Sequence, residues 1–368
     1  MKLRYKILNG VSGVIALGVA ALMLTVSHDS PCSPAPALAA GVESMNAVTI
    51  RCYGVPRAAQ FARVEKPKPG AGQILIKVRA SSVNPAEWYG VSGQPYLVRL
   101  MAGIGAPKDT RSGFDVAGVV EAVGADVKLF KPGDEVFGGA WGAYAQYAIA
   151  REQGGIIRKP AELGFEEAAA IPIAAITALQ GLRDQGGLAA GKKVLVNGAS
   201  GGVGTYAVQI AKAFGAEVTG VCSTRNVAMV SALGADHVVD YTKDNFTKSD
   251  ARYDIILDNV GSQDFADMAH VMAPGGVIVV VGGSKKGPFL GPIKRIAWSR
   301  LAQPFMDARI RFYLAEVKKA DLELLANLAR DGKLRSVIDR RYPLDQTGAA
   351  LAYLGEGHAR GKVVITVD

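Results

Sequence analysis

The pattern of apolar and polar positions changes once along the chain and predicts two kinds of architecture. Between residues 45 and 165, short alternating runs are separated by turn signals such as Pro69-Gly70, as in a small β-barrel. From about residue 165, helical patterns alternate with short buried runs, which is typical of a parallel, doubly wound sheet. The predicted strands are residues 46–52, 73–79, 116–123, 194–197, 218–222, 237–240, 253–259, 277–282 and 362–368.

A glycine-rich turn lies between one of these buried runs and a helical pattern. Asn197-Gly-Ala-Ser-Gly-Gly-Val-Gly204 follows Lys193–Val196 and opens the helical pattern Thr205–Lys212. Glycines let the backbone approach a pyrophosphate, whose charge then faces the free N–H groups of the helix start. We therefore predict dinucleotide binding rather than a plain glycine-rich turn, although Ala199 occupies the position of the usual first glycine. The predicted contacts are Ala199, Ser200, Gly201, Gly202, Val203 and Gly204.

The residues after the second strand of this region indicate which nicotinamide cofactor binds. An Asp or Glu there would repel a ribose 2′-phosphate. This chain instead has Ser223-Thr-Arg225-Asn, whose hydroxyls and guanidinium can donate to a phosphate. The prediction is NADPH, with Ser223 and Arg225 as contacts; the alternative is that Arg225 is a solvated loop charge.

A third group of residues falls at strand ends or at a helix start, where ligands gather in open α/β sheets. These residues are Thr177, Asn259, Val260, Gly261, Gly282 and Gly283. We predict that they lie around the nicotinamide ring. Gly261 and Gly283 are also compatible with a simple role in turns.

The N-terminus differs from the rest of the chain. Lys2, Arg4 and Lys6 precede the uncharged segment Ile7–Val26, which is long enough to cross a bilayer as a helix. A Pro/Ala-rich stretch follows and predicts a linker without regular structure. An uncleaved single-span membrane anchor fits best, and a signal peptide cleaved after Ala37-Leu-Ala39 is the alternative. The three positive charges before the span predict that the folded domain lies outside the cytoplasm. A reduced nicotinamide cofactor is instead expected in the cytoplasm, so the sequence leaves both sides of the membrane possible for the domain.

Composition narrows the class further. The 368 residues are 49% hydrophobic and 20% charged, as in a globular chain of two domains. The net charge of +9 is dispersed, which predicts a solvated basic surface and no nucleic-acid partner. Cys32, Cys52 and Cys222 are far apart, so neither a disulfide framework nor a four-cysteine zinc site is expected.

Past Met45 the chain resembles the zinc-free quinone oxidoreductase (zeta-crystallin-like) branch of the medium-chain dehydrogenase/reductase superfamily. The motifs that carry the resemblance are Ser82-Val-Asn-Pro85, Gly113–Gly124, Phe130–Gly138, Ala168-Ala-Ala-Ile-Pro172 with Thr177-Ala178, Ala199–Gly204, Gly234–Tyr241, Asp258-Asn-Val-Gly261 and Gly357–Lys362. The resemblance implies an α/β fold with a GroES-like catalytic domain and a Rossmann domain, and it implies Tyr241 as an adenosine-phosphate contact. The expected division is an anchor or signal peptide (1–27), a linker (28–44), the GroES-like domain (45–165), the Rossmann domain (166–308) and a segment returning to the catalytic domain (309–368).

Departures from zinc-dependent relatives predict that no metal is bound. Asn84 occupies the first ligand region, and Phe114-Asp115 stands where those relatives have Gly-His-Glu. Neither supplies a thiolate or an imidazole, and the lobe with four structural cysteines is missing.

The residues expected beside the hydride acceptor are Asn84, Glu87 and Tyr89. They stand at the spacing where members of the family that the chain resembles keep an Asn, an acidic residue and often a Tyr. Asn84 and Tyr89, with Thr177, are the predicted catalytic residues, because they could stabilise charge on a carbonyl oxygen; the alternative is a structural turn. We expect reduction of a quinone or an α,β-unsaturated carbonyl compound by a membrane-tethered enzyme that could form a homodimer. The alternatives are an enoyl-thioester reductase and a non-catalytic NADP(H)-binding sensor.

Overall fold

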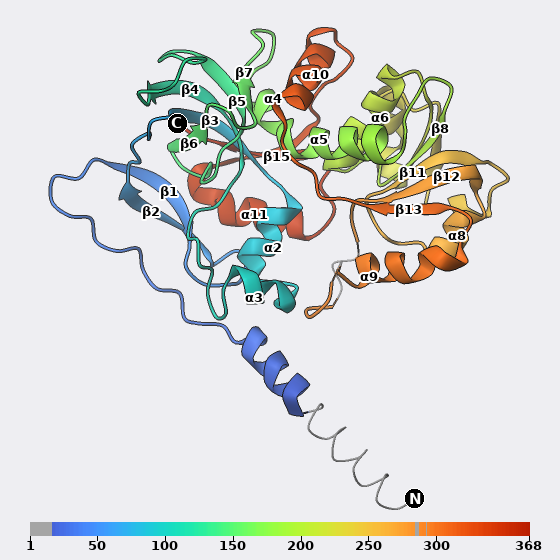
Figure 1. Ribbon diagram of the computed structural model, residues 1–368, viewed down its shortest axis with the longest axis horizontal. Helices are drawn as coiled ribbons and strands as arrows, with labels where there is room; N and C mark the ends of the chain where they lie inside the picture. The colour runs from blue at the N-terminus through green and yellow to red at the C-terminus, as the bar shows by residue number, and fades with distance from the viewer. Residues whose placement is uncertain (1–16, 284–286, 292) are drawn as a thin grey trace, which may run out of the picture.

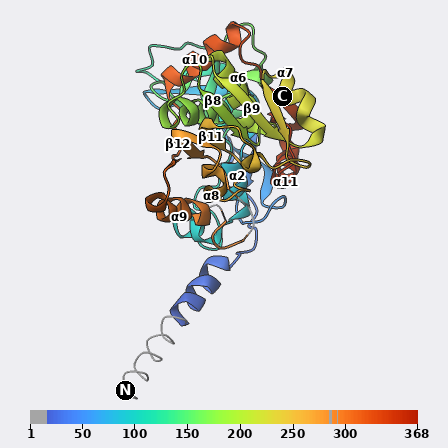
Figure 2. The ribbon, with the colours of Figure 1, turned by 90° about the vertical axis from the view of Figure 1, so that its right-hand side faces the viewer.

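The computed structural model describes residues 17–283, 287–291 and 293–368. It has two lobes, each built around its own sheet, and a helix over residues 17–27 that extends from the body (Figures 1 and 2). The lobes correspond to the two sequence patterns. One lobe has the strands with alternating apolar and polar residues, and the other has strands that alternate with helices along the chain.

The Rossmann lobe contains a six-stranded parallel sheet of order β10-β9-β8-β11-β12-β13. Its strands are apolar because helices cover both faces of the sheet. The strands are β8 (Lys193–Asn197), β9 (Glu217–Cys222), β10 (His237–Asp240), β11 (Tyr253–Asp258), β12 (Met272–Val280) and β13 (Arg309–Phe312). The helices are α5 (Pro172–Gln180), α6 (Gly202–Ala213), α7 (Val227–Ala232), α8 (Phe265–Ala269), α9 (Ile293–Ala302) and α10 (Lys319–Arg330), and the 3-10 turn η5 (Gln303–Phe305) follows α9.

The catalytic lobe contains a seven-stranded sheet in which β14-β15-β3-β4-β5-β7 are neighbours and β6 pairs with β3; β1 and β2 form a separate hairpin. The strands are β1 (Ser44–Ile50), β2 (Ala59–Glu65), β3 (Gln73–Val83), β4 (Asp115–Val123), β5 (Glu135–Gly139), β6 (Tyr147–Arg151), β7 (Ile156–Arg158), β14 (Ile338–Pro343) and β15 (Lys362–Thr366). The helices are α2 (Pro85–Ser92), α3 (Arg99–Ala102), α4 (Phe165–Ala170) and α11 (Thr347–Gly355), and η1 (Tyr96–Val98) precedes α3.

The chain crosses between the lobes more than once. β15 pairs antiparallel with β3, so the C-terminal segment lies in the catalytic lobe. β13 pairs with β12, so the Rossmann sheet continues past residue 308, where the sequence pattern had placed its end. Four residues with one strand-like alternation, Arg309–Phe312, give too short a signal to extend the predicted domain.

The N-terminal segment is described only from residue 17. Residues 17–27 are helical and mostly exposed, whereas residues 7–16 of the predicted membrane span lie outside the described part of the chain. Among the residues that the structure describes, no helix combines the length and the apolar character needed to cross a bilayer.

The predicted linker is docked onto the catalytic lobe. Arg99 is 2% exposed, and its guanidinium donates to the carbonyl oxygens of Val26 (3.2 Å) and His28 (3.0 Å) and pairs with Asp29 (2.9 Å). The same guanidinium lies over the Tyr53 ring, 4.2 Å from its centroid. A buried cation needs such partners, and here most of them come from the N-terminal segment.

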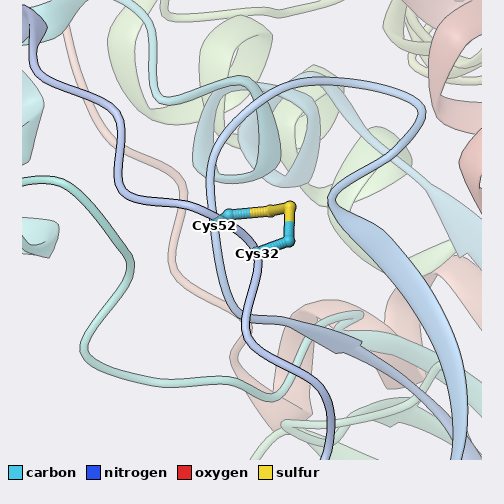
Figure 3. The surroundings of a disulfide bond; sticks show 2 residues. All are labelled: Cys32 and Cys52. Carbon is cyan, nitrogen blue, oxygen red and sulfur yellow. A yellow bond between two sulfur atoms is a disulfide. The ribbon is translucent and has the colours of Figure 1, made fainter.

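A disulfide joins Cys32 to Cys52 across the same contact, with the Cα atoms 4.8 Å apart (Figure 3). The cysteine spacing predicted no disulfide framework and did not reveal this single disulfide, which leaves Cys222 as the free cysteine. The separation of 20 residues between the paired cysteines carries no pairing signal, because the docking on Arg99 is what brings residue 32 beside the end of β1.

The disulfide predicts a specific thiol count. Denatured, unreduced protein should react with one maleimide per chain, at Cys222, and reduced protein with three. The variant Cys32→Ser/Cys52→Ser should lose about 3 kcal/mol of unfolding free energy, because the closed loop restricts the unfolded chain. Mass spectrometry and denaturant titration measure the two quantities.

The matched control is Cys222→Ala, which should show no reactive thiol before reduction and two after it. Three reactive thiols in the unreduced wild-type protein would contradict the pairing.

Candidate active site at the junction of the lobes

The glycine turn joins β8 to α6, as the sequence pattern predicts. Gly198 has φ +80°, and a Cβ atom at Gly204 would lie 2.0 Å from the Gly198 carbonyl oxygen, so both positions require glycine. Gly201 is the N-cap of α6, and the N–H groups of the first helical turn, including those of Gly202 and Val203, have no partner within the helix. Ala199, within the turn, is fully buried, and its N–H donates to the Val221 carbonyl at 2.9 Å.

Two buried amide oxygens near this turn indicate that the region fits a nucleotide. The Oδ1 atoms of Asn226 and Asn259 have no hydrogen-bond partner. Asn226 donates through Nδ2 to the hydroxyls of Ser200 (3.0 Å) and Ser223 (3.2 Å), so its free oxygen lies among predicted cofactor contacts. Unpaired buried acceptors are costly, and the hydroxyl and carboxamide groups of a dinucleotide are suitable donors. Asn226 was not among the predicted contacts.

The predicted contacts for the adenosine end come together at the carboxyl ends of β9 and β10. Cys222 pairs with Asp240 across these strands, and the N–H of Tyr241 donates to the Cys222 carbonyl at 3.0 Å. Ser223 and Arg225 follow directly, and Tyr241 is exposed. The guanidinium of Arg225 is also exposed and donates to the His358 carbonyl of the catalytic lobe at 3.1 Å.

The two loops that we predict to lie around the nicotinamide ring are packed closely against each other. A Cβ atom at Gly282 would lie 2.1 Å from the Asn259 carbonyl oxygen, and one at Gly261 would lie 2.9 Å from the Gly283 Cα, so these glycines permit the close approach. Val260 lies in the same loop and is 42% exposed. Thr177 lies on α5, where its hydroxyl donates to the Ile173 carbonyl at 2.6 Å.

An ion pair that sequence patterns did not reveal holds the first of these loops. Asp258 is fully buried, accepts the Gly261 N–H at 3.0 Å, and pairs with Arg295 of α9 at 2.5 Å. Arg295 also donates to the Gln263 carbonyl at 3.0 Å. The two residues are 37 positions apart, so no local pattern pointed to the pair.

A buried polar cluster lies at the start of α2 on the catalytic side. The fully buried carboxylate of Asp115 accepts hydrogen bonds from the Ser82 hydroxyl (2.6 Å), the Asn84 Nδ2 (2.9 Å) and the Ile173 N–H (3.0 Å). The Lys362 ammonium, 3% exposed, lies 3.5 Å from the same carboxylate and donates to the Asn84 Oδ1. The Asp115 cluster, as we name these five residues, therefore connects β3, β4, α5 and β15.

The C-terminal segment links this cluster to the glycine turn. The Gly361 N–H donates to the Ser200 carbonyl at 2.9 Å, and Gly201 and Gly361 form a parallel bridge. A Cβ atom at Gly202 would lie 3.3 Å from the Lys362 Cδ. The backbone of the glycine turn and the start of α2 thus share one support.

Asn84 and Tyr89 occupy different environments on α2. Asn84 is 2% exposed and is held through both ends of its amide by Asp115 and Lys362, so its position suits the support of α2 better than contact with an acceptor. Tyr89 is half-buried, and its ring meets that of Trp88 edge-on with centroids 5.2 Å apart. Burial raises the pKa of Tyr89, so its hydroxyl stays protonated and able to donate at neutral pH.

Glu87 completes the start of α2. Its carboxylate accepts the Asn84 N–H at 3.0 Å. Burial, and then repulsion from Asp115, raise the pKa of Glu87 to about 7. Among the described residues, no group of three or more His, Cys, Asp or Glu side chains is arranged to hold a metal ion.

This fold and turn define a nicotinamide-dependent oxidoreductase of the medium-chain type, and comparisons with known proteins agree. Residues 70–161 match the alcohol dehydrogenase GroES-like domain, and residues 233–365 match the zinc-binding dehydrogenase family. The chain is 34% identical over 339 residues to the chloroplast envelope quinone oxidoreductase homolog of Arabidopsis thaliana, covering 87% of this chain and 98% of that relative. It is 35% identical over 307 residues to the 2-methylene-furan-3-one reductase of Solanum lycopersicum, covering 80% of this chain and 71% of that relative.

A solved structure shows the same architecture. The quinone oxidoreductase from Coxiella burnetii superposes with a TM-score of 0.78 at 30% identity, covering 89% of this chain and all of that one. The chain therefore belongs to the zinc-free quinone oxidoreductase branch of the medium-chain dehydrogenase/reductase superfamily.

The Glu87 carboxyl predicts a definite pH dependence of stability. A carboxyl that titrates near 7 when folded and near 4.5 when unfolded binds more protons in the native state between these values. The free energy of unfolding should therefore fall as pH rises from about 4.5 to about 7. In Glu87→Gln, whose side chain stays neutral, this component should disappear.

Denaturant titrations of the wild type and Glu87→Gln at several pH values between 5 and 8 measure this difference. Glu162→Gln, which changes an exposed carboxylate in the loop before α4, serves as the control and should follow the wild type. Parallel pH profiles for the wild type and Glu87→Gln would show that Glu87 titrates in its ordinary range.

Proposed function

We propose that the protein is a zinc-independent, NADPH-dependent reductase of quinones or α,β-unsaturated carbonyl compounds. The observation that carries the proposal is the shared support of the glycine turn and α2: Gly361 holds the turn, and Lys362 holds the Asp115 cluster. A cofactor held by the turn is thereby kept in a fixed relation to Tyr89.

The proposed acceptors share one chemical feature, a C=C bond conjugated to a carbonyl group. That feature is common to the quinones and the methylene-furanone in the names of the relatives. The bound nicotinamide supplies a hydride. A quinone takes up that hydride and one proton to become a hydroquinone, as NADPH becomes NADP⁺; an enone takes the hydride at its β-carbon and the proton at its α-carbon.

In this proposal the protein side chains stabilise charge on the acceptor oxygen. Tyr89 is the donor, because its hydroxyl is protonated at neutral pH and it lies on the helix that the Asp115 cluster caps. Asn84 acts as a positioning residue, since Asp115 and Lys362 already bind its amide. Thr177 lies next to the cluster through α5 and could accept a hydrogen bond from the cofactor, because its own proton is directed to Ile173.

The acceptor assignment is tested by NADPH oxidation with quinones, enones, enoyl thioesters and saturated ketones. We expect turnover with the first two classes, and a kcat about 10- to 100-fold lower in Tyr89→Phe, because one donor to the developing oxyanion is lost. The Kd for NADPH should stay unchanged, as measured by fluorescence titration.

Tyr353→Phe, which loses a hydroxyl bound to Asp339 elsewhere in the catalytic lobe, is the matched control and should keep full kcat. Full kcat in Tyr89→Phe would make Tyr89 structural. A preference for enoyl thioesters would identify the alternative enzyme, and binding of NADPH without any turnover would indicate a sensor.

NADPH, rather than NADH, is the proposed cofactor. Support comes from Ser223, Arg225 and Tyr241, which lie together at the ends of β9 and β10. The carboxylate at the end of β10, Asp240, already accepts hydrogen bonds from the hydroxyls of Thr224 (2.6 Å) and Thr242 (2.7 Å). The guanidinium of Arg225 is accessible, and its present partner is only a carbonyl group, so a phosphate dianion would be a stronger one.

NADPH should bind about ten- to a hundredfold more tightly than NADH, as expected from charge-assisted hydrogen bonds to one phosphate. Arg225→Ala should remove most of this preference and leave the Kd for NADH unchanged. Ser223→Asp should reverse it. Isothermal titration calorimetry of the wild type and the two variants with each cofactor gives the six dissociation constants.

Arg311→Ala removes an equal charge from an exposed position on β13 and should preserve the preference. Equal affinities of the wild-type protein for the two cofactors would show that Arg225 is a solvated charge.

We also propose that the apolar N-terminal segment attaches the protein to a membrane. The support is the uncharged run Ile7–Val26 and the helix at residues 17–27, which extends away from the body (Figure 1). The Cys32–Cys52 disulfide favours an oxidising compartment, which is the side that the three N-terminal positive charges also indicate. Cleavage after Ala39 would remove Cys32 and Asp29, the partners of Cys52 and Arg99, so the uncleaved form suits the fold better.

A further inference from the structure

Large apolar side chains are exposed at the end of the molecule from which the N-terminal helix extends. They belong to η1, α3 and the residues after it in the catalytic lobe, and to α9, η5 and the preceding loop in the Rossmann lobe. We call this set the apolar end: Val98, Leu100, Met101, Ile104, Leu290, Trp298, Leu301 and Phe305. Met101 is 83% exposed and Phe305 is 89% exposed. Large apolar side chains that are exposed together at one end of a protein usually mark a contact surface.

Helix α9 and the turn after it have the composition of a segment that lies at a membrane surface. Trp298 and Leu301 are three residues apart on α9, which places them along one side of the helix, and Phe305 follows in η5. Lys294 and Arg300 are exposed on the same helix. Apolar and tryptophan side chains along one stripe, with basic residues beside it, suit the boundary between acyl chains and anionic headgroups.

The two halves of the apolar end are joined directly. The Tyr96 N–H of η1 donates to the Pro288 carbonyl at 2.7 Å, and the Tyr96 and Phe289 rings meet edge-on with centroids 5.2 Å apart. In both views, α9 lies at the end of the body from which the helix of residues 17–27 extends, and α3 lies there in Figure 1.

The N-terminal helix is also fixed in relation to this surface. Arg99, the first residue of α3, binds the carbonyl groups of Val26 and His28 at the end of that helix, and it pairs with Asp29. A bilayer that receives the apolar segment Ile7–Val26 would therefore lie next to the apolar end. This continuity, together with the basic residues on α9, favours a lipid surface over a second copy of the chain.

Both walls of the candidate site continue into the apolar end. On the catalytic side, the chain runs from Tyr89 on α2 through η1 to Met101. On the Rossmann side, the chain that follows Gly282-Gly283 leads to α9 and Trp298. An acceptor at the membrane surface would thus meet the junction of the lobes at the end nearest to the bilayer.

We propose that the apolar end rests on a lipid bilayer and that the acceptor is a quinone with a long apolar tail, taken from that bilayer. This proposal rests on the quinone reductase activity proposed above and specifies its substrate class. The quinone accepts a hydride from NADPH and a proton from water and leaves as the hydroquinone, with its tail still in the membrane.

The experiment uses the full chain in vesicles of phosphatidylcholine and phosphatidylglycerol. Rates of NADPH oxidation are compared for a tail-less, water-soluble quinone and for a quinone with a long isoprenoid tail in the bilayer. Leu301→Ser/Phe305→Ser should lower the rate with the tailed quinone about tenfold or more, because two apolar contacts with lipid are lost. It should leave the rate with the soluble quinone unchanged. Phe61→Ser/Leu314→Ser removes the same residue types from exposed sites elsewhere and should change neither rate.

A second measurement does not depend on activity. Lipids brominated along their acyl chains should quench the fluorescence of Trp298. The wild-type protein should therefore fluoresce less in brominated than in unbrominated vesicles, and this difference should disappear in Trp298→Phe. Equal quenching of the wild type and Trp298→Phe would overturn the proposal. So would an equal loss of rate with the tailed and the soluble quinone in Leu301→Ser/Phe305→Ser. So would a solution dimer that Leu301→Ser/Phe305→Ser dissociates, because the surface would then be an interface between copies. Absence of turnover with the soluble quinone would contradict the proposed function instead, whatever the quenching shows.

Discussion

The carboxylate of Asp115 is the constraint on which the arrangement of the two lobes depends. It is fully buried, and its donors come from β3, from the residue that caps α2, from the backbone of α5, and from Lys362 on β15. A buried charge is tolerated only when it is fully paired, so each of these elements must reach it. Since α5 belongs to the Rossmann lobe and β15 follows the bridge to the glycine turn, the cluster fixes the position of the glycine turn relative to α2.

For the proposed function, this arrangement supplies what a reductase needs when no metal ion acts as a Lewis acid. Charge on the acceptor oxygen needs a donor whose position is already set, because reorganisation during the reaction costs free energy. The Asp115 cluster sets the start of α2, and Tyr89 lies one and a half turns along that helix. Asp258 and Arg295 fix the opposite loop in the same way, through a second buried ion pair.

The sequence predicted most of the fold because its signals are local. Apolar runs predicted β1, β3, β4 and β15, whereas the strands β2, β5, β6, β7 and β14 were missed. The glycine-rich motif predicted the turn that joins β8 to α6. The supports of the site depend on contacts that no local pattern records: Lys362 is 278 residues from Asn84, and Arg295 is 37 from Asp258. For the same reason, the pairing of Cys32 with Cys52 was missed, since it follows from the docking of the N-terminal segment on Arg99.

In the proposed function, hydride passes directly from the nicotinamide to an acceptor held in one fixed position. The sharpest test of this transfer follows deuterium from NADPH that is labelled at one or the other of its two C4 positions. With an enone acceptor, NMR of the product shows where the label arrives. We expect the β-carbon to receive deuterium from one C4 position only, because the Asp115 cluster holds the glycine turn and α2 in one relation. Delivery from both positions, or loss of the label to water, would contradict this view of the site.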